Sequence, residues 1–169
     1  MSETLEPALP DHLDEQAERL MRRLRDKGLT VATAESCTGG MLAALLTDIE
    51  GAGQGFERGF VTYTKESKAE LLGIPDDLLD RNDAVSEIVA EAMAEGALAR
   101  SRADLALGVT GFAGPAGDSC AEGLVHFALA RRGGETVHRE EHFRAIGRGP
   151  LRVVSLRTML MMLDDAVGD

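Results

Sequence analysis

The sequence contains no tryptophan and a single tyrosine, and aromatic residues make up only 4% of its 169 residues. Proteins that bind single-stranded nucleic acids stack bases on aromatic side chains, so this scarcity disfavours that class. Basic residues are too few to balance the acidic ones, which gives a formal net charge of -11 and an isoelectric point of about 4.8. Because no long run of Lys or Arg occurs, we expect no nucleic-acid partner.

Cysteine is also scarce, since Cys37 and Cys120 are the two cysteines of the chain. They form no CxxC motif and are too few for a disulfide framework, which is typical of proteins of the reducing cytoplasm. No run of 18 or more apolar residues occurs, so we expect no membrane span and no membrane partner. The acidic N-terminal segment MSETLEPALPDHLDEQ lacks the basic and apolar parts of a signal peptide, and we therefore predict a cytoplasmic location.

Apolar residues are present in the amount expected of a folded domain. Hydrophobic residues make up 44% of the chain and charged residues 28%, which supports a core and excludes wholesale disorder. A mass of 18.0 kDa fits one domain rather than two. We expect residues 1–10, which contain two prolines and little periodicity, to form a loose lead-in to a single domain at residues 11–169.

Apolar residues recur at helical spacing in several segments, most clearly at Leu13, Ala17, Leu20, Met21 and Leu24. This spacing, with glycines as stops, predicts five helices, at residues 11–27, 41–49, 65–72, 84–101 and 151–163. Short apolar runs predict five strands, at residues 29–34, 56–64, 105–109, 124–130 and 136–143.

Helices and strands are mingled along the chain with no internal repeat, which predicts an α/β fold with a single three-layer α/β/α domain. The last two predicted strands turn at Gly133 and Gly134 and are close enough in sequence to pair antiparallel. We therefore expect a mixed, mostly parallel sheet.

The first segment that could carry chemistry is AESCTGG at residues 34–40, where a predicted strand leads into a predicted helix. The first amides of a helix have no internal partner and can hold an anion or a developing oxyanion. Ser36 would expose its hydroxyl there, while Gly39 and Gly40 would let a substrate approach the backbone. The alternative is that Ser36 or Thr38 only caps the helix. The segment does not match GxSxG, so it does not indicate an α/β-hydrolase.

A second candidate is VTYTKESK at residues 61–68, with Tyr63 near a strand end and Lys68 in the first turns of a helix. A serine hydroxyl is a poor nucleophile until a base takes its proton, and a lysine with a lowered pKa can be that base. The Tyr63 hydroxyl could relay the proton or orient the lysine. The alternative is an exposed lysine that pairs with Glu66 or Glu70, next to an amphipathic tyrosine at a sheet edge.

A third candidate is the loop from Thr110 to Gly117, where small residues follow a buried strand. Such a loop can form a nest of backbone amides for a phosphate. It does not match GxxxxGK[ST], however, and an ordinary connecting turn is the alternative.

Metal-binding and thiol chemistry have weaker support. His138 and His142 would lie about 13 Å apart along one strand, which is too far for one metal ion. His126 lies in an apolar strand, which is typical of a core side chain whose polar atoms are satisfied. Cys37 could replace Ser36 as the nucleophile, but no nearby histidine suggests an activating partner. We expect no metal site.

Four segments taken together resemble the C-terminal domain of the CinA family, whose stand-alone members are nicotinamide-nucleotide amidases. These segments are AESCTGG at 34–40, VTYTKESKAELLGI at 61–74, AVSEIVAEAMAEGA at 84–97 and GVTGFAGPAG at 108–117. Each alone is unspecific, but all four in this order make a strong match. The resemblance extends from about Leu13 to Leu163, and the ending FRAIGRGPLRVVSL is similar to the family more faintly.

The resemblance implies hydrolysis of the amide of nicotinamide mononucleotide to nicotinic acid mononucleotide and ammonia, without metal or cofactor. It implies Ser36 as the nucleophile, Lys68 as its general base and Tyr63 as an assisting residue. The residues that it implies for the oxyanion and the substrate are Cys37, Thr38, Gly39, Gly40, Thr110, Gly111, Ala113, Gly114 and Arg148. It also implies a pyridine nucleotide as the small-molecule partner, a phosphate contact at Arg148, and a homo-oligomer.

The sequence departs from the family pattern in several places. Lys65 stands where the family has Asn, and a second ammonium near Lys68 could lower the pKa of Lys68 or disturb the pocket. The loop at 114–123 is shorter than the family's glycine-rich loop and lacks its lysine and second proline. Residues 147–149 are Gly-Arg-Gly, without the acid of the family's Gly-Asp-Arg element. The large N-terminal domain of full-length CinA proteins is missing, so we expect no pyrophosphatase activity.

Two other functions fit the same residues. The altered loop allows a hydrolase that acts on another small amide or ester through the same serine and lysine. A protein that keeps a nucleotide pocket but performs no chemistry is the non-enzymatic alternative.

Overall fold

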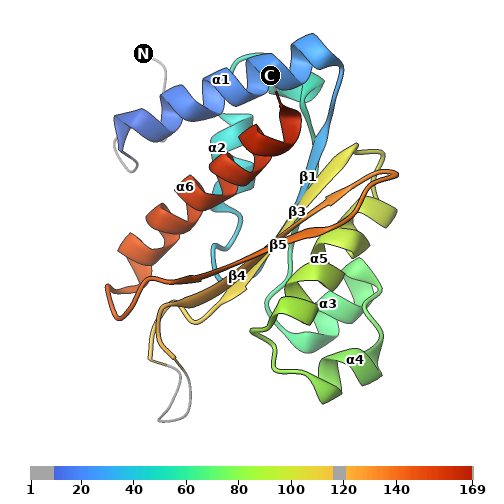
Figure 1. The fold of residues 1–169 in the computed structure, drawn as a ribbon, viewed down its shortest axis with the longest axis vertical. Helices are drawn as coiled ribbons and strands as arrows, with labels where there is room; N and C mark the ends of the chain where they lie inside the picture. Colours follow the sequence, from blue (N-terminus) through green and yellow to red (C-terminus); the bar gives the residue numbers. More distant parts are fainter. Residues whose placement is uncertain (1–9, 116–120, 169) are drawn as a thin grey trace.

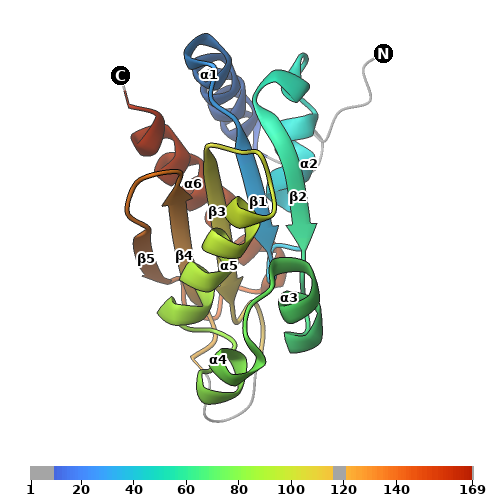
Figure 2. The ribbon, with the colours of Figure 1, turned by 90° about the vertical axis from the view of Figure 1, so that its right-hand side faces the viewer.

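The computed structural model describes residues 10–115 and 121–168, which form a sheet between two layers of helices (Figures 1 and 2). The strands are β1 (Val31–Glu35), β2 (Phe56–Val61), β3 (Leu105–Gly111), β4 (Leu124–Arg131) and β5 (Val137–His142). The helices are α1 (Asp11–Lys27), α2 (Met41–Thr47), α3 (Lys65–Leu72), α4 (Asp76–Arg81), α5 (Glu87–Ala99) and α6 (Arg148–Val167), with a short 3-10 helix at Ala52–Gln54.

The five strands lie in the order β2-β1-β3-β4-β5. β1 pairs in parallel with β2 and β3, whereas β4 pairs antiparallel with both β3 and β5. Among these five strands, β4 therefore runs against the other four. The predicted three-layer α/β domain with a mixed, mostly parallel sheet is confirmed.

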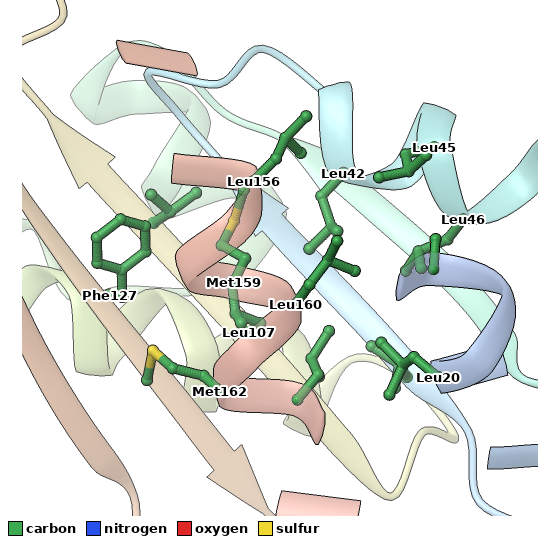
Figure 3. Packing of buried hydrophobic residues seen from close by; sticks show 14 of the residues in the cluster. Leu20, Leu42, Leu45, Leu46, Leu107, Phe127, Leu156, Met159, Leu160 and Met162 are labelled. Atoms are coloured by element: carbon green, nitrogen blue, oxygen red, sulfur yellow. The ribbon is translucent and has the colours of Figure 1, made fainter. Parts of the chain in front are cut away.

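The larger core lies between the sheet and the layer formed by α1, α2 and α6 (Figure 1). Figure 3 shows Met159 and Leu160 of α6 beside Leu42 of α2 and Leu107 of β3. Leu20 of α1 joins the same cluster, and all five side chains are buried. Burial of apolar side chains on this scale contributes most of the free energy that holds the two layers together.

The opposite layer packs more closely, because small residues face each other where α5 crosses β3. A Cβ atom added at Gly108 would lie 2.6 Å from the carbonyl oxygen of Ala90 and 2.7 Å from the amide nitrogen of Ala94. Ala128 of β4 is buried against the same face of α5. The alanine-rich sequence of α5 thus lets this helix lie directly on the backbone of β3.

The observed strand ends lie within three residues of the predicted ones, and the differences at β2 and β3 have a clear cause. β2 ends at Val61 rather than at residue 64, because Thr64 caps α3: its side chain accepts a hydrogen bond from the Ser67 amide. β3 continues beyond residue 109 to Gly111, since the antiparallel ladder with β4 extends as far as the pair of Gly111 with Val125.

Four helices also differ from the expectation, among them α2, which ends at Thr47 rather than at residue 49. α6 begins at Arg148 rather than Leu151, because Pro150 falls in the first turn, where an amide needs no intrahelical partner. α5 begins after Ser86, whose side chain accepts from the Val89 amide. α4 has no counterpart among the predicted helices, although its two acidic residues in the first turn and its arginine in the last turn are helix signals.

The parallel strands place their carboxyl ends at one edge of the sheet. Figure 2 shows β1 and β2 side by side, with both arrowheads directed toward α3. The three segments that follow β1, β2 and β3 therefore meet at this edge, which is where open α/β sheets bind ligands. Within the described ranges, no helix has the length and apolar character needed to cross a bilayer.

Candidate active site

One cavity of about 200 Å³ opens where the segments after β1, β2 and β3 meet. Residues from all three candidate segments and from the start of α6 line it. The predicted site residues in its wall are Ser36, Cys37, Tyr63, Lys68, Thr110, Gly111, Ala113, Gly114 and Arg148. The cavity lining does not include Thr38, Gly39 and Gly40, which belong to the turn between β1 and α2.

Ser36 and Lys68 are 32 residues apart in sequence and meet in the cavity, with 3.2 Å between Lys68 Nζ and Ser36 Oγ. The Ser36 amide donates to the carbonyl oxygen of Val109, which extends the pairing of β1 with β3 and fixes the serine backbone. Lys68 lies in the first turns of α3, and its amide donates to the Thr64 carbonyl. The serine is thus held by the sheet and the lysine by a capped helix.

The Lys68 ammonium has little contact with water, because the residue is 2% exposed. Burial lowers the pKa of Lys68, since removing water disfavours the charged form. Its Nζ also lies 3.3 Å from the carbonyl oxygen of Thr62 and 3.1 Å from that of Tyr63. An ammonium can donate to all three oxygens, whereas a neutral amine can donate to the two carbonyls and accept a hydrogen bond from the Ser36 hydroxyl.

Tyr63 takes part in the site in a different way from the expected one. Its backbone carbonyl accepts the hydrogen bond from Lys68, while its side chain is 67% exposed at the cavity mouth. In this arrangement the carbonyl oxygen, and not the phenol hydroxyl, orients the lysine.

Cys37 lines the cavity beside Ser36, but its chemistry does not suit a nucleophile. Burial raises the pKa of the Cys37 thiol to about 12, and the negative charge of Glu35 adds to the shift. Because the thiolate is the reactive form of cysteine, this thiol is inert near neutral pH. The geometry therefore favours Ser36 over Cys37.

The turn between β1 and α2 is organised by a buried carboxylate. Glu35 is fully buried and accepts hydrogen bonds from Thr38 Oγ1 at 2.6 Å and from three amides at the start of α2. Those amides belong to Gly40 at 3.1 Å, Leu42 at 3.2 Å and Ala43 at 2.9 Å. The expectation that Ser36 or Thr38 caps α2 is wrong in this structure, because the Glu35 side chain occupies that position.

This network limits which amides of the turn can reach a substrate. The Gly39 amide donates to the carbonyl oxygen of Ser36, and the Gly40 amide donates to Glu35, so neither is available in this arrangement to an oxyanion. Among residues 10–115 and 121–168, the amides of Cys37 and Thr38 donate to no oxygen acceptor. Gly39 and Gly40 instead serve the turn through left-handed backbone conformations, with φ of 65° and 93°.

The segment after β3 and the start of α6 form the other side of the cavity. Thr110 is buried, and its hydroxyl donates to the carbonyl oxygen of Ala84, which also lines the cavity. A Cβ atom at Gly114 would lie 3.0 Å from a terminal nitrogen of Arg148, so this glycine makes room for the guanidinium. Residues 116–120, where the loop differs most from the family sequence, lie outside the described residues.

Lys65 does not face Lys68. Its ammonium lies 3.7 Å from a carboxylate oxygen of Asp80 in α4, on the exposed side of α3. The expected effect of a second ammonium on Lys68 is therefore not produced in this arrangement, and burial is what lowers the pKa of Lys68.

Several residues of the site were not among the site residues predicted from the sequence, although Glu35, Phe112 and Pro115 lie within its candidate segments. They are Glu35 and Arg152, which hold the turn, and Ala84, Val85, Phe112 and Pro115, which line the cavity. Arg152 Nε donates to the Cys37 carbonyl at 2.9 Å across 115 residues of sequence, which no local pattern reveals. Glu35 could have been found, because it precedes a helix whose N-cap is a glycine without a capping side chain.

Comparison with known proteins gives a consistent set of relatives. The chain matches the model of the CinA C-terminal domain over residues 13–167. It is 47% identical over 129 residues to the nicotinamide-nucleotide amidohydrolase PncC of Escherichia coli K12, and the aligned region covers 75% of this chain and 78% of that protein. It is 53% identical over 115 residues to a CinA-like protein of Akkermansia muciniphila, which covers 67% of this chain and 28% of that protein. The chain spans 27–34% of the longer relatives of this kind.

Solved structures share the whole fold. The competence/damage inducible protein CihA of Agrobacterium tumefaciens has a TM-score of 0.90 and 44% identity, with 95% of this chain and 98% of that chain covered. A CinA superfamily protein of Escherichia coli has a TM-score of 0.85 and 36% identity, with 92% and 91% covered. Since both the sequence match and the shared fold extend over nearly the entire chain, this protein belongs to the family of CinA C-terminal domains.

Proposed function

We propose that the protein hydrolyses the carboxamide of nicotinamide mononucleotide and releases ammonia and nicotinic acid mononucleotide. The observation that carries the proposal is the buried contact of 3.2 Å between Lys68 Nζ and Ser36 Oγ in the cavity. The relative named nicotinamide-nucleotide amidohydrolase, 47% identical over most of both chains, supports this choice of substrate.

The proposed mechanism begins with a neutral Lys68. The carbonyl oxygens of Thr62 and Tyr63 accept its two N–H groups, so that its lone pair faces the Ser36 hydroxyl. Ser36 Oγ attacks the carboxamide carbon as its proton passes to Lys68 Nζ, and a tetrahedral oxyanion forms. Lys68 then gives the proton to the leaving nitrogen, the C–N bond breaks, and ammonia departs from an acyl-serine.

Water completes the reaction by the same route. Lys68 Nζ takes a proton from a water molecule whose oxygen attacks the acyl carbon, and the bond to Ser36 Oγ breaks as that oxygen regains a proton. The amides of Cys37 and Thr38 are the donors assigned to the oxyanion, because the described residues offer them no oxygen acceptor. This assignment replaces the expected role of Gly39 and Gly40.

Arg148 is the residue that we assign to the phosphate of the substrate. It is the first residue of α6 and lines the cavity, with its guanidinium against Gly114. A guanidinium can bind phosphate oxygens through two parallel charge-assisted hydrogen bonds. It also supplies local positive charge at the cavity of a protein whose net charge is -11.

The test is a panel of small carboxamides and esters incubated with the purified protein, with products identified by mass spectrometry. We expect nicotinamide mononucleotide to yield equal amounts of ammonia and nicotinic acid mononucleotide, at a rate unaffected by chelators. Turnover of another amide, with none of the mononucleotide, would assign a different substrate. Thermal stabilisation by the mononucleotide without any product would instead indicate a binding protein.

A further inference from the structure

Helix α2 lacks the capping side chain that would normally fix its start. Its N-cap is Gly40, which has no side chain and a φ of 93°. Helices usually satisfy their first amides with a Ser, Thr, Asp or Asn at this position, and an uncapped start would leave the preceding turn free to shift. Ser36 lies in that preceding turn, so the position of its hydroxyl depends on what replaces the cap.

Glu35 supplies the missing cap from five residues upstream. Its two carboxylate oxygens accept from the amides of Gly40, Leu42 and Ala43 and from Thr38 Oγ1, at distances from 2.6 to 3.2 Å. The side chain is fully buried, so no water competes for these bonds. Hydrogen bonds to a carboxylate are roughly twice as strong as neutral ones, and four of them converge here.

The backbone of the same residue connects the turn to the anchor of the base. The Glu35 carbonyl accepts from the Thr62 amide at 2.9 Å, and the Thr62 carbonyl in turn accepts from Lys68 Nζ. Ser36 follows Glu35 directly in the chain. One residue thus joins the end of β1, the start of α2 and the segment that orients the lysine.

We infer that Glu35 is the positioning residue of this site: its carboxylate holds the turn so that Ser36 Oγ stays within reach of Lys68. The inference rests on the proposed Ser-Lys chemistry, but it concerns geometry and not the identity of the substrate. The amides at the start of α2 therefore bind an internal carboxylate and not an anion of the substrate.

The test replaces Glu35 by its uncharged isostere, Glu35→Gln, which turns one acceptor oxygen into an N–H group facing amide donors. We expect kcat to fall about 100-fold, as displacements near 1 Å do at reacting centres. KM should stay within about threefold, because Glu35 does not line the cavity. Hydrogen exchange at the amides of Gly40, Leu42 and Ala43 should become faster, since they lose their acceptor.

Asp104→Asn is the matched control. Asp104 accepts from the amide and hydroxyl of Thr30 at 2.9 and 3.1 Å, at the opposite end of β1 and β3 from the cavity. Its replacement also removes a carboxylate that joins two elements, but far from Ser36. We expect a loss of thermal stability with an unchanged kcat.

A second readout separates this inference from the proposed substrate. Modification of Ser36 by a fluorophosphonate reports the reactivity of the hydroxyl without any amide, and we expect it to slow in Glu35→Gln to the same extent as kcat. A wild-type protein that reacts with the fluorophosphonate but releases no ammonia would refute the substrate and leave the inference open to this test. A wild-type protein that does not react with it would overturn both.

Equal rates of modification in folded Glu35→Gln and wild type would overturn the inference, as would a loss no larger than that of Asp104→Asn. If Glu35→Gln does not fold, Thr38→Val provides the decision, because it removes one of the four donors and keeps the carboxylate. We expect Thr38→Val to lower kcat several-fold at constant KM, and an unchanged kcat would then refute the role of Glu35.

Discussion

At the scale of single residues, the partners of Lys68 determine what the lysine can do. Two carbonyl oxygens and one hydroxyl surround Nζ within 3.1 to 3.3 Å. An ammonium can donate to all three oxygens, and a neutral amine can donate to two of them and accept from the hydroxyl. Burial lowers the pKa of Lys68 and so favours the neutral amine that a general base must be.

This arrangement predicts the pH dependence of the reaction. Because only the neutral amine can accept the Ser36 proton, kcat/KM should rise with pH and level off above an apparent pKa that lies below the ordinary lysine value of about 10.4. Lys65→Met is the control, since Lys65 pairs with Asp80 outside the cavity, and it should keep both the profile and the activity. A profile that is flat from pH 5 to 10 in the wild type would contradict this role of Lys68.

The residues that the sequence could indicate are those whose chemistry is carried by local motifs. Ser36 and Lys68 follow strand ends, so two patterns far apart in the chain predict their meeting at one edge of the sheet. Tyr63 was predicted for its side chain, whereas its observed contact with Lys68 is made by the carbonyl oxygen, which a sequence pattern does not reveal. Arg152 could not be found, since its contact with Cys37 depends on how α6 packs against the turn.

At the scale of elements, the close contact of α5 with β3 depends on one missing side chain. Gly108 lies where a Cβ atom would come within 2.7 Å of two backbone atoms of α5, and backbone atoms cannot move aside without displacing the helix. We predict that Gly108→Ala lowers the free energy of unfolding by about 1–3 kcal/mol, the usual cost of overpacking. Denaturant unfolding measures this difference.

Gly53→Ala is the control for that measurement, because a Cβ atom there has no described neighbour within 4 Å and its φ is not in the left-handed region. It should change stability by less than about 0.5 kcal/mol, as surface substitutions usually do. Equal effects of the two substitutions would show that the contact between α5 and β3 does not limit the size of residue 108.

Two histidines of neighbouring strands, which do not line the cavity, form a second titrating pair. His126 of β4 is buried. The polar partner of this core histidine is another imidazole, because its Nδ1 lies 3.0 Å from Nε2 of His138 in β5. Glu140 lies 3.9 Å from His126, and Glu87 of α5 lies 3.6 Å from His138. Burial lowers the pKa of His126 despite the nearby Glu140.

The lowered pKa predicts that acid destabilises the fold through His126. A histidine whose pKa is lower in the folded state binds fewer protons there, so its contribution to stability is present above the unfolded value of about 6.5 and is lost as the pH falls. We expect the thermal unfolding midpoint to decrease as the pH is lowered from 7 to 5, and to decrease less in His126→Asn. Identical slopes in His126→Asn and wild type would refute the prediction.

Periodicity located most of the elements, but not every end. α1 was predictable because five apolar residues mark one face and Gly28 adopts the left-handed conformation that ends the helix. The early start of α6 and the whole of α4 were missed, since Pro150 and Pro75 resemble helix breaks when tertiary contacts are unknown. Leu79 of α4 is buried in the core on the α5 side of the sheet, and this tertiary contact, which the six-residue sequence does not show, stabilises the helix.

At the scale of the whole molecule, the charge and the cavity limit the class of ligand. A net charge of -11 repels polyanions, whereas Arg148 brings a positive charge to the cavity wall. Under the proposed function, Arg148 binds the phosphate of a pyridine nucleotide. Self-association and a cytoplasmic location stay predictions that size measurements and localisation experiments can address.

The match to longer proteins also belongs to this scale. Relatives such as the CinA-like protein of Akkermansia muciniphila are covered over 28% of their length, whereas the Escherichia coli PncC is covered over 78%. Those longer proteins are therefore compared with this chain only over the part that matches, and the solved structures share the fold over most of their length.

The rate of ammonia release from nicotinamide mononucleotide, compared between wild type, Ser36→Ala and Lys68→Met, tests the account most directly. We predict that each substitution lowers kcat at least about 1,000-fold, the scale seen when a nucleophile or its base is removed. Thermal unfolding should show that both variants remain folded. Wild-type turnover in either folded variant would contradict the Ser-Lys chemistry on which the account depends.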